Sequence, residues 1–97
     1  MGPKKILVFT ATYNEVQNAP LLLADIWGAL PEADVLIVDD NSPDGTGKLL
    51  DSMAKGDVRL KVIHRPRKLG LGSAHYLAMI YAMRHKYDLL VTMDADL

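Results

Sequence analysis

The chain has 97 residues, of which 49% are hydrophobic and 24% charged, and its formal net charge is −1. This composition is typical of an ordinary globular protein, and the length allows one domain at most. The near-neutral charge argues against a general nucleic-acid-binding protein, and the absence of cysteine excludes a disulfide framework and a cysteine metal site. No apolar run approaches the ~20 residues that a membrane-spanning helix needs.

Strand-like and helix-like patterns alternate along the sequence. The strand-like segments are short and apolar, and they cover residues 5–11, 34–38, 58–63 and 87–93. The first helix-like segment has apolar residues at i, i+3 and i+4 spacings and covers residues 16–30, and a second covers residues 45–54. A third helix lies within residues 69–85 and starts near Gly72 and Ser73. Short connections and right-handed crossovers then predict an α/β fold, in which a parallel sheet has helices on both faces.

Some details of these elements are predicted as well. Asp44 stands before the second helix and is expected to cap it, because aspartate oxygens accept hydrogen bonds from the free amides at a helix start. Residues 58–63 alternate apolar and basic side chains, which indicates a strand nearer the edge of the sheet. Met79, Met83 and Met93 are expected to fill the core.

Acidic residues stand directly after two of the apolar strands. Asp39 and Asp40 follow the strand at 34–38, whereas Asp94 and Asp96 follow the last strand. Open α/β sheets bind ligands at the edge where their strands end. Adjacent carboxylates repel each other and raise each other's pKa, so they need a partner. Their positions favour a division in which Asp39 braces the next turn and Asp40 reaches a ligand.

Asp94 and Asp96 would point the same way if the segment after the last strand is extended. Two carboxylates placed in this way can hold Mg²⁺ or Mn²⁺ through hard oxygen ligands. The ion would bridge them to a diphosphate and stabilise the charge of a leaving group. An isolated Asp-x-Asp pattern is a weak signal, and a solvated turn is the commoner explanation for it.

Further side chains are expected at the same edge of the sheet. Tyr13 could stack on a base and Glu15 could bond the edge of that base, although a half-buried aromatic that closes the helix face explains Tyr13 equally well. Arg65, Arg67 and Lys68 could meet a phosphate or a carboxylate. For any single one of these three, a solvated charge is the expected state.

Four sequence blocks follow one another across nearly the whole chain. They read Ala-Thr-Tyr-Asn-Glu at 11–15, Val-Asp-Asp-Asn-Ser-Pro-Asp-Gly-Thr at 38–46, Arg-Lys-Leu-Gly-Leu-Gly-Ser-Ala at 67–74 and Met-Asp-Ala-Asp-Leu at 93–97. Together they resemble the family 2 glycosyltransferases of the GT-A fold, which is Rossmann-like, and most of all the polyprenol (dolichol) monophosphate mannose synthases. The block at 38–46 is the most specific. Ala11 replaces the family's usual proline at a contact made mainly by the backbone.

The resemblance implies an inverting enzyme that transfers mannose from GDP-mannose to a polyprenyl (dolichyl) phosphate. By position, it implies that the nucleotide sugar contacts Ala11, Tyr13, Glu15, Val38, Asp40, Asp94, Ala95 and Asp96. Asp94 and Asp96 would hold the divalent metal, Mg²⁺ or Mn²⁺, and would thereby be the catalytic residues. An acceptor phosphate is already a nucleophile at neutral pH, so positioning and leaving-group stabilisation matter more than a general base.

The resemblance also implies that residues 1–97 are the donor half of a truncated GT-A domain, because the family's chain continues beyond the Asp-Ala-Asp segment. Leu97 stands just after a strand at the expected site, which favours the same interpretation. The absent C-terminal part would contact the polyprenyl phosphate acceptor. The chain alone is therefore expected to have little or no transferase activity, and its parent enzyme is expected at the cytoplasmic face of a membrane.

Three alternatives remain open. One is another family 2 glycosyltransferase that uses a UDP-sugar, and a second is a non-catalytic nucleotide-binding module. The third is a phospho-receiver domain, which also has an acidic pair and a later aspartate on a small parallel α/β domain. In a receiver the pair follows the first strand and a lysine follows a later one. Here the pair follows the second strand, and the expected lysine has no counterpart.

Overall fold

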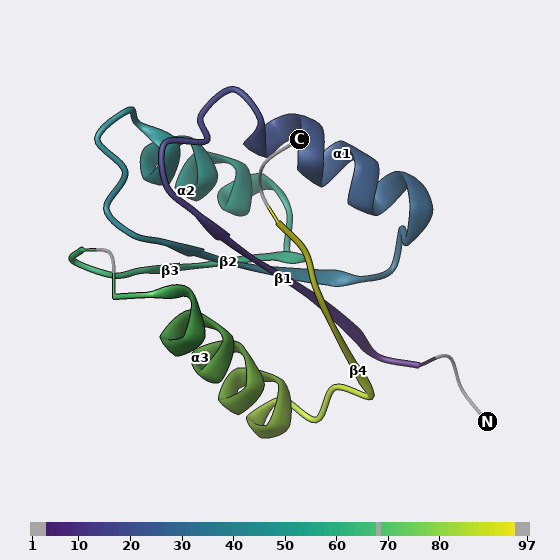
Figure 1. The fold of residues 1–97 in the computed structure, drawn as a ribbon. Helices are drawn as coiled ribbons and strands as arrows, with labels where there is room; N and C mark the ends of the chain where they lie inside the picture. The colour runs from purple at the N-terminus through teal and green to yellow at the C-terminus, as the bar shows by residue number, and fades with distance from the viewer. Residues whose placement is uncertain (1–3, 68, 95–97) are drawn as a thin grey trace.

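A single parallel sheet of four strands lies between helices in the computed structural model, which describes residues 4–67 and 69–94 (Figure 1). In chain order the elements are β1 (Ile6–Thr12), α1 (Ala19–Ala29), β2 (Asp34–Asp39), α2 (Thr46–Gly56), β3 (Leu60–His64), α3 (Leu71–Arg84) and β4 (Leu89–Thr92). The predicted α/β class and the predicted alternation of strands and helices are both confirmed.

The strands lie in the order β3–β2–β1–β4, and all neighbours are parallel. Two crossovers lead outward from β1 to β2 and β3, and the chain then returns to place β4 on the other side of β1. β3 is an edge strand, as its alternating sequence predicts. A phospho-receiver domain would place β3 beside β1, so this topology excludes that alternative.

The core consists of two apolar clusters, one on each face of the sheet, because successive strand residues point to opposite faces. The cluster under α1 and α2 includes Val8, Leu22, Leu23, Ile26, Val35, Ile37 and Leu50. The cluster under α3 includes Leu7, Phe9, Leu36, Val38, Ala74, Ala78 and Ala82. Each large side chain buried in this way contributes about 1.5–3 kcal/mol relative to an exposed one. The two central strands therefore hold both helix layers in place.

The helix α3 packs on the sheet through small residues. Ala74, Ala78 and Ala82 recur every four residues and are buried. Leu77 and Tyr81 pack beside them, whereas other bulky residues point away, and the exposed fractions of Met79 and Met83 are 52% and 72%. Met93, after β4, is 40% exposed. The prediction that these methionines fill the core is therefore wrong, because alanines occupy the buried stripe of α3.

The start of α2 also differs from the prediction. Gly45 immediately precedes the helix and has φ +93°, a left-handed conformation that favours glycine. Gly45 and not Asp44 is therefore the capping residue. Asp44 still binds the helix start, since its Oδ1 accepts a hydrogen bond from the Thr46 amide at 3.0 Å. Its Oδ2 accepts another from the Val16 amide at 3.1 Å, which ties α2 to the segment before α1.

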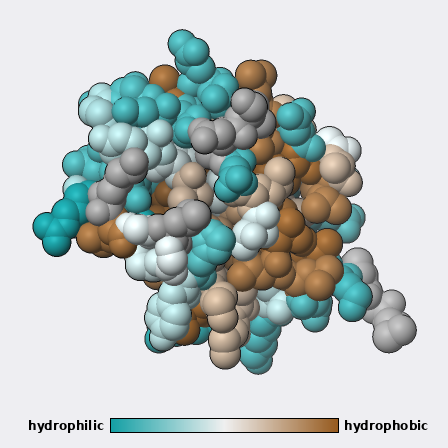
Figure 2. Space-filling model, viewed as in Figure 1, coloured by the Kyte–Doolittle hydropathy of each residue, from teal (hydrophilic) through white to brown (hydrophobic). Residues whose placement is uncertain are grey.

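β4 is the second edge of the sheet and is less covered than the inner strands. Leu89 and Val91 are 46% and 37% exposed. Figure 2 shows hydrophobic residues gathered on the face that carries β4. Among the residues that the structure describes, no helix is both long enough and apolar enough to cross a bilayer.

Candidate functional site

The carboxyl ends of the strands bring the predicted site segments to one edge of the sheet. Thr12, at the end of β1, pairs with Asp39, and Asp39 pairs with His64 at the end of β3. Asp94 follows β4, which pairs with β1 on its other side. The order of the strands reverses between β1 and β4, and crevices at such a reversal are the usual ligand sites of open α/β sheets.

Asp39 braces the turn that follows β2, in agreement with the prediction. Its side chain is buried, and Oδ1 accepts hydrogen bonds from Thr12 Oγ1 at 2.8 Å and from Ser42 Oγ at 2.6 Å. Its Oδ2 accepts a third from the Ser42 amide at 3.1 Å. Both carboxylate oxygens are thus used to hold the end of β1 against the turn after β2.

Asp40 points to the other face of the sheet, where it meets a cation. Arg65 donates from Nε to Asp40 Oδ1 at 2.6 Å and from Nη2 to Oδ2 at 2.8 Å. Nη1 of the same guanidinium donates to Ser73 Oγ at 2.6 Å. Only 7% of Asp40 and 9% of Arg65 are exposed. The expectation that Arg65 is a solvated charge is therefore wrong.

The position of Arg65 explains this pairing. It is the first residue after β3, and its amide donates to the carbonyl of Asp39 at 2.9 Å, so it continues the parallel pairing with β2. The side chain then reaches Asp40, one residue further along β2. The sequence contained a signal for this ion pair, because an acidic residue follows β2 and a basic residue follows β3, the neighbouring parallel strand. Ser73, which completes the contact, gives no comparable signal.

Three of the predicted nucleotide-sugar residues share the α3 face of the sheet. Ala11 and Val38 belong to the apolar cluster under α3, and Asp40 follows at its rim. Val38 is completely buried. No part of Val38 is thus exposed on this face, and its contact with a nucleotide sugar stays a prediction.

Tyr13 and Glu15 lie in the loop after β1, which is fixed against the turn after β2. The Asn14 amide donates to Ser42 Oγ at 3.0 Å, and the Glu15 amide donates to Thr46 Oγ1 at 3.0 Å. Tyr13 is 38% exposed, so part of its ring is open to solvent. The loop that would meet a base is thus held in one place by groups of the neighbouring turn.

The predicted metal pair is described only in part. Asp94 is exposed beyond the end of β4, whereas Ala95 and Asp96 lie outside the described residues. Over residues 4–67 and 69–94, no three histidine or acidic side chains are grouped closely enough to hold a metal ion. Asp94 offers one hard carboxylate at the correct edge of the sheet, and the two-carboxylate metal site stays a prediction.

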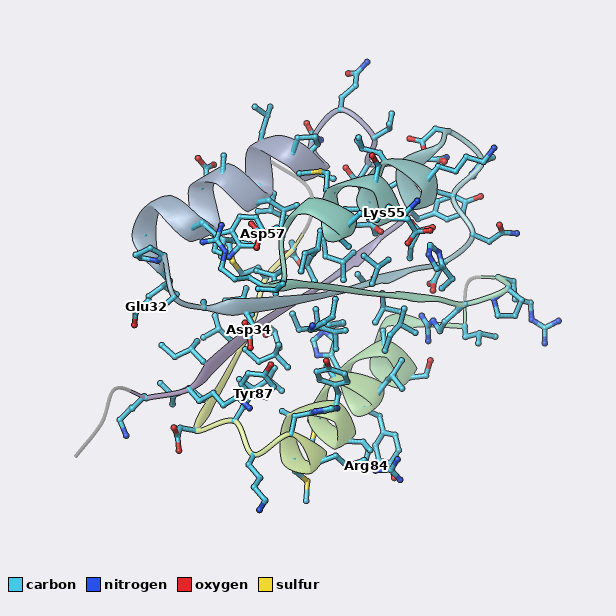
Figure 3. The ribbon with its side chains drawn as sticks, turned by 180° about the vertical axis from the view of Figure 1, so that it is seen from behind. Glu32, Asp34, Lys55, Asp57, Arg84 and Tyr87 are labelled. Carbon is cyan, nitrogen blue, oxygen red and sulfur yellow. The ribbon has the colours of Figure 1, made fainter. Side chains whose placement is uncertain are left out.

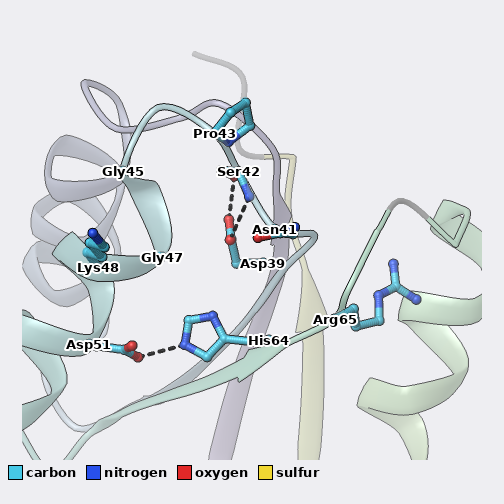
Figure 4. Close-up of a pocket in the computed structure, with 10 residues that line it drawn as sticks. All are labelled: Asp39, Asn41, Ser42, Pro43, Gly45, Gly47, Lys48, Asp51, His64 and Arg65. Carbon is cyan, nitrogen blue, oxygen red and sulfur yellow. Dashed lines mark hydrogen bonds and ion pairs between the residues drawn. The ribbon is translucent and has the colours of Figure 1, made fainter.

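A pocket of about 270 Å³ opens on the other side of β2, beneath the start of α2 (Figure 4). Its lining includes Asp39, Ser42, Gly47, Lys48, Asp51 and His64. Of the candidate residues, Arg65 also lines this pocket, whereas Tyr13, Asp40 and Asp94 do not. Asp39 and Asp40 point to opposite faces, and Arg65 lies between the pocket and the surface around Asp40.

The opposite edge of the sheet has a polar contact with a structural role. Tyr87 donates from its hydroxyl to Asp34 Oδ2 at 2.6 Å (Figure 3). Burial, together with the carboxylate of Asp34, raises the pKa of Tyr87 far above its usual range. This contact ties the start of β2 to the segment before β4 and keeps the tyrosine in its neutral form.

Residues 7–97 match the family described as Glycosyl transferase family 2. The chain is 46% identical over 92 residues to the undecaprenyl-phosphate mannosyltransferase of Micrococcus luteus, and 45% identical over 94 residues to the polyprenol monophosphomannose synthase of Mycolicibacterium smegmatis. These matches cover 95% and 96% of this chain but only 38% and 36% of the relatives. The chain thus spans little more than a third of their length.

Solved structures have the same arrangement of strands and helices. A mannosyltransferase from Pyrobaculum calidifontis, in complex with GDP-Man and Mn²⁺, superposes with a TM-score of 0.75 at 25% identity, over 98% of this chain and 28% of that one. TarS from S. aureus superposes with a TM-score of 0.65 at 22% identity, over 95% of this chain and 27% of that one. The second likeness concerns the fold alone.

Proposed function

We propose, from the premise that the chain belongs to glycosyl transferase family 2, that it is the donor-binding part of an enzyme that transfers mannose from GDP-mannose to a polyprenyl phosphate. The names of two similar proteins support the transfer of mannose and a polyprenol acceptor. A similar structure that contains GDP-Man and Mn²⁺ supports the donor and the metal. One observation carries the proposal. The parallel pairing of β1 with β2 and with β4 brings the loop after β1, Asp40 and Asp94 to the same edge of the sheet.

The nucleoside is proposed to lie over the α3 side of this edge. Tyr13 would stack on the base, with Glu15 and the backbone of Ala11 beside it, and the carboxylate of Asp40 would accept a hydrogen bond from the base or from ribose. Arg65 would hold that carboxylate in a single orientation, because it binds both oxygens in a planar fork. A ligand would therefore meet an acceptor whose position is already fixed.

The diphosphate is proposed to lie toward β4, beside Asp94, Ala95 and Asp96. The residues present suit a hard divalent cation, because Asp94 is an exposed carboxylate at the strand end and Asp96 follows it by two positions. Mg²⁺ or Mn²⁺ bound there would stabilise the negative charge of the departing nucleotide. Attack by the acceptor phosphate from the opposite side of the sugar would invert its configuration.

The acceptor site is proposed to lie in sequence that this chain does not contain. The relatives are more than twice as long, and the described loops at this edge come only from the strands already discussed. We therefore expect the chain to bind the donor nucleotide and to transfer little or no mannose alone. The lipid acceptor would bring the parent enzyme to a membrane surface.

Calorimetric titration of the chain with GDP and Mn²⁺ tests the donor site. Asp40→Asn is expected to weaken GDP binding by about tenfold or more, because a hydrogen bond to a charged acceptor is lost. Asp51→Asn, on the far side of β2 and exposed, is the matched control and should bind as the wild type does. Each protein is titrated only after circular dichroism shows that it is folded. An unchanged affinity for GDP in Asp40→Asn would show that Asp40 does not contact the nucleotide.

Two further measurements separate the alternatives. UDP is expected to bind more weakly than GDP, and equal or tighter binding would favour the family 2 enzyme that uses a UDP-sugar. Transfer of mannose to a prenyl phosphate by the purified chain would overturn the proposal that it is only the donor half. A non-catalytic module would bind nucleotide but would remain inactive in a protein as long as the relatives.

A further inference from the structure

Charge is distributed unevenly along the chain. All 12 acidic residues lie outside residues 58–87. This segment instead contains most of the basic residues, namely Arg59, Lys61, Arg65, Arg67, Lys68, Arg84 and Lys86. Its formal charge is +7 and that of the remainder is −8, which together give the net charge of −1. Arg59 and Arg65 pair with Asp57 and Asp40 from outside this segment, whereas α3 and the residues just after it contribute Arg84 and Lys86.

The outer face of α3 is apolar. Tyr76, Met79 and Met83 are 64%, 52% and 72% exposed, and their spacing places them in one line along the helix. They lie away from the alanines that pack on the sheet, whereas Leu77 and Tyr81 pack beside those alanines against the same cluster. Scattered exposed apolar residues need no explanation, but an aligned group on one helix face marks an interaction surface.

Basic residues flank one end of this stripe. Arg84 is the last residue of α3 and Lys86 follows it, and both are exposed. The view from behind shows Arg84 directed away from the sheet (Figure 3). Within the described part of the chain, neither residue forms an ion pair. α3 itself contains no acidic residue. The surface therefore combines an apolar line with uncompensated positive charge.

We infer that the outer face of α3 docks on an anionic lipid bilayer. A helix with an apolar face and flanking cations lies in the plane of the interface, with its apolar side chains among the lipid headgroups and its cations beside anionic lipids. Tyrosine is a side chain that favours this boundary. α3 would lie on the membrane and would not cross it, since it has 14 residues.

Charge complementarity selects lipid over a second copy of the chain. In a symmetric contact between parallel α3 helices, Arg84 and Lys86 would lie near their own counterparts, and like charges repel. In an antiparallel contact they would meet the start of the partner's α3, which has no acidic residue to pair with them. An anionic surface instead attracts both residues and buries the stripe. The inference rests on the α3 face alone and does not depend on the nucleotide site.

The test is co-sedimentation of the chain with vesicles of phosphatidylglycerol and phosphatidylcholine, compared with vesicles of phosphatidylcholine alone. Two variants remove parts of the surface, Met79→Gln/Met83→Gln and Arg84→Gln/Lys86→Gln. Two matched controls change exposed residues elsewhere, Leu21→Gln/Val58→Gln and Lys4→Gln/Lys55→Gln. The paired controls alter the same number of apolar or basic side chains.

The wild-type chain is expected to bind the anionic vesicles and to lose this binding as salt is added. Arg84→Gln/Lys86→Gln should weaken the partition by about tenfold or more, since each cation near an anionic surface contributes roughly fivefold. Met79→Gln/Met83→Gln should weaken it markedly, whereas both controls should stay near the wild type. The affinity for GDP should be unchanged in the α3 variants. A failure of the lipid-docking proposal can therefore be told apart from a failure of the donor-site proposal.

Three results would overturn the inference. The first is a folded wild-type chain that does not bind anionic vesicles. The second is an equal loss of binding in the α3 variants and in their controls. The third is an oligomer in solution that Met79→Gln/Met83→Gln dissociates while vesicle binding persists, because the stripe would then be an interface between copies of the chain.

Discussion

Arg65 binds both carboxylate oxygens of Asp40, at 2.6 Å through Nε and at 2.8 Å through Nη2. The pair lies at the rim of the sheet with most of its surface removed from water. Through Ser73, the same guanidinium also reaches the first turn of α3. One arginine therefore connects the ends of two strands with the start of a helix.

Removal of either partner of this pair should destabilise the fold strongly. Asp40→Ala or Arg65→Met would leave one buried charge uncompensated, which costs about 3–5 kcal/mol. The double variant should lose clearly less than the sum of the two single losses, because no isolated charge remains. Urea unfolding of the four proteins measures this coupling energy.

The contact between His64 Nε2 and Asp51 Oδ1, at 2.8 Å, provides the control for that cycle. Its side chains are 46% and 53% exposed, so it is screened by solvent. Asp51→Asn should therefore change the free energy of unfolding by less than about 1 kcal/mol. Additive losses in the Asp40 and Arg65 cycle would show that their bidentate contact does not form in solution.

Ser42→Ala tests the link between the two loops of the candidate site. The Ser42 hydroxyl donates to Asp39 and accepts from the Asn14 amide, so its loss breaks a contact on each side. The expected cost is about 1–2 kcal/mol in the free energy of unfolding. Ser52→Ala, at an exposed position in α2, should be neutral or slightly stabilising. Equal stabilities of the two variants would argue against this link.

The sequence predicts the layers of this fold because apolar pattern and burial coincide in its inner strands. The run Val35–Val38 is buried on both faces and was recognisable as an inner strand for that reason. The bracing role of Asp39 was also predictable, since Asp39 and Asp40 are consecutive and point to opposite faces, whereas the contact of Asp40 with a ligand stays a prediction. Both predictions depend on short-range geometry that the sequence contains.

The errors concern contacts that depend on how elements approach one another. Met83 is more hydrophobic than Ala82, but the close approach of α3 to the sheet selects the smaller residue for the buried side. Gly45 takes the capping position because a left-handed backbone precedes α2, which the aspartate before it does not reveal. The partner of Arg65 depends on the register of β2 and β3, so charge pattern alone predicted a solvated side chain.

A side chain at Gly47 would be crowded by Asp39 and by the ring of His64, although the residue lies in a helix. A Cβ there would stand 3.1 Å from Asp39 Oδ2, and Asp39 is held in place by Thr12 and Ser42. Gly47→Ala should therefore cost about 1–3 kcal/mol through crowding, more than the ~1 kcal/mol that alanine gains in a helix.

Gly28→Ala is the matched control, since Gly28 lies in α1 with nothing within 4 Å of the added Cβ. It should stabilise the chain by up to about 1 kcal/mol. Thermal unfolding of both variants gives the comparison. If Gly47→Ala is as stable as Gly28→Ala, then Asp39 is free to move and the turn after β2 is less constrained than its hydrogen bonds indicate.

Asp44 should make the stability of the chain depend on pH in the acid range. Desolvation alone would raise the pKa of Asp44, but hydrogen bonds from Thr46 and Val16 outweigh it and lower the pKa below its model-compound value of 3.8. The folded state therefore favours the ionised form. The stabilisation is fully present above the unfolded pKa, and it is lost as the pH falls through the lower folded pKa.

Asp44→Asn should accordingly be less stable than the wild type at pH 7, with a difference that shrinks as the pH falls below about 4. Urea unfolding at several pH values between 7 and 2 measures the difference, and Asp25→Asn, exposed on α1, controls for the loss of one negative charge. The two hydrogen bonds that Asp44 accepts join the start of α2 to the segment before α1. Asp44→Asn should therefore also loosen the attachment of the loop that carries Tyr13. A stability difference that stays constant down to pH 2 would mean that the charge of Asp44 has no part in this contact.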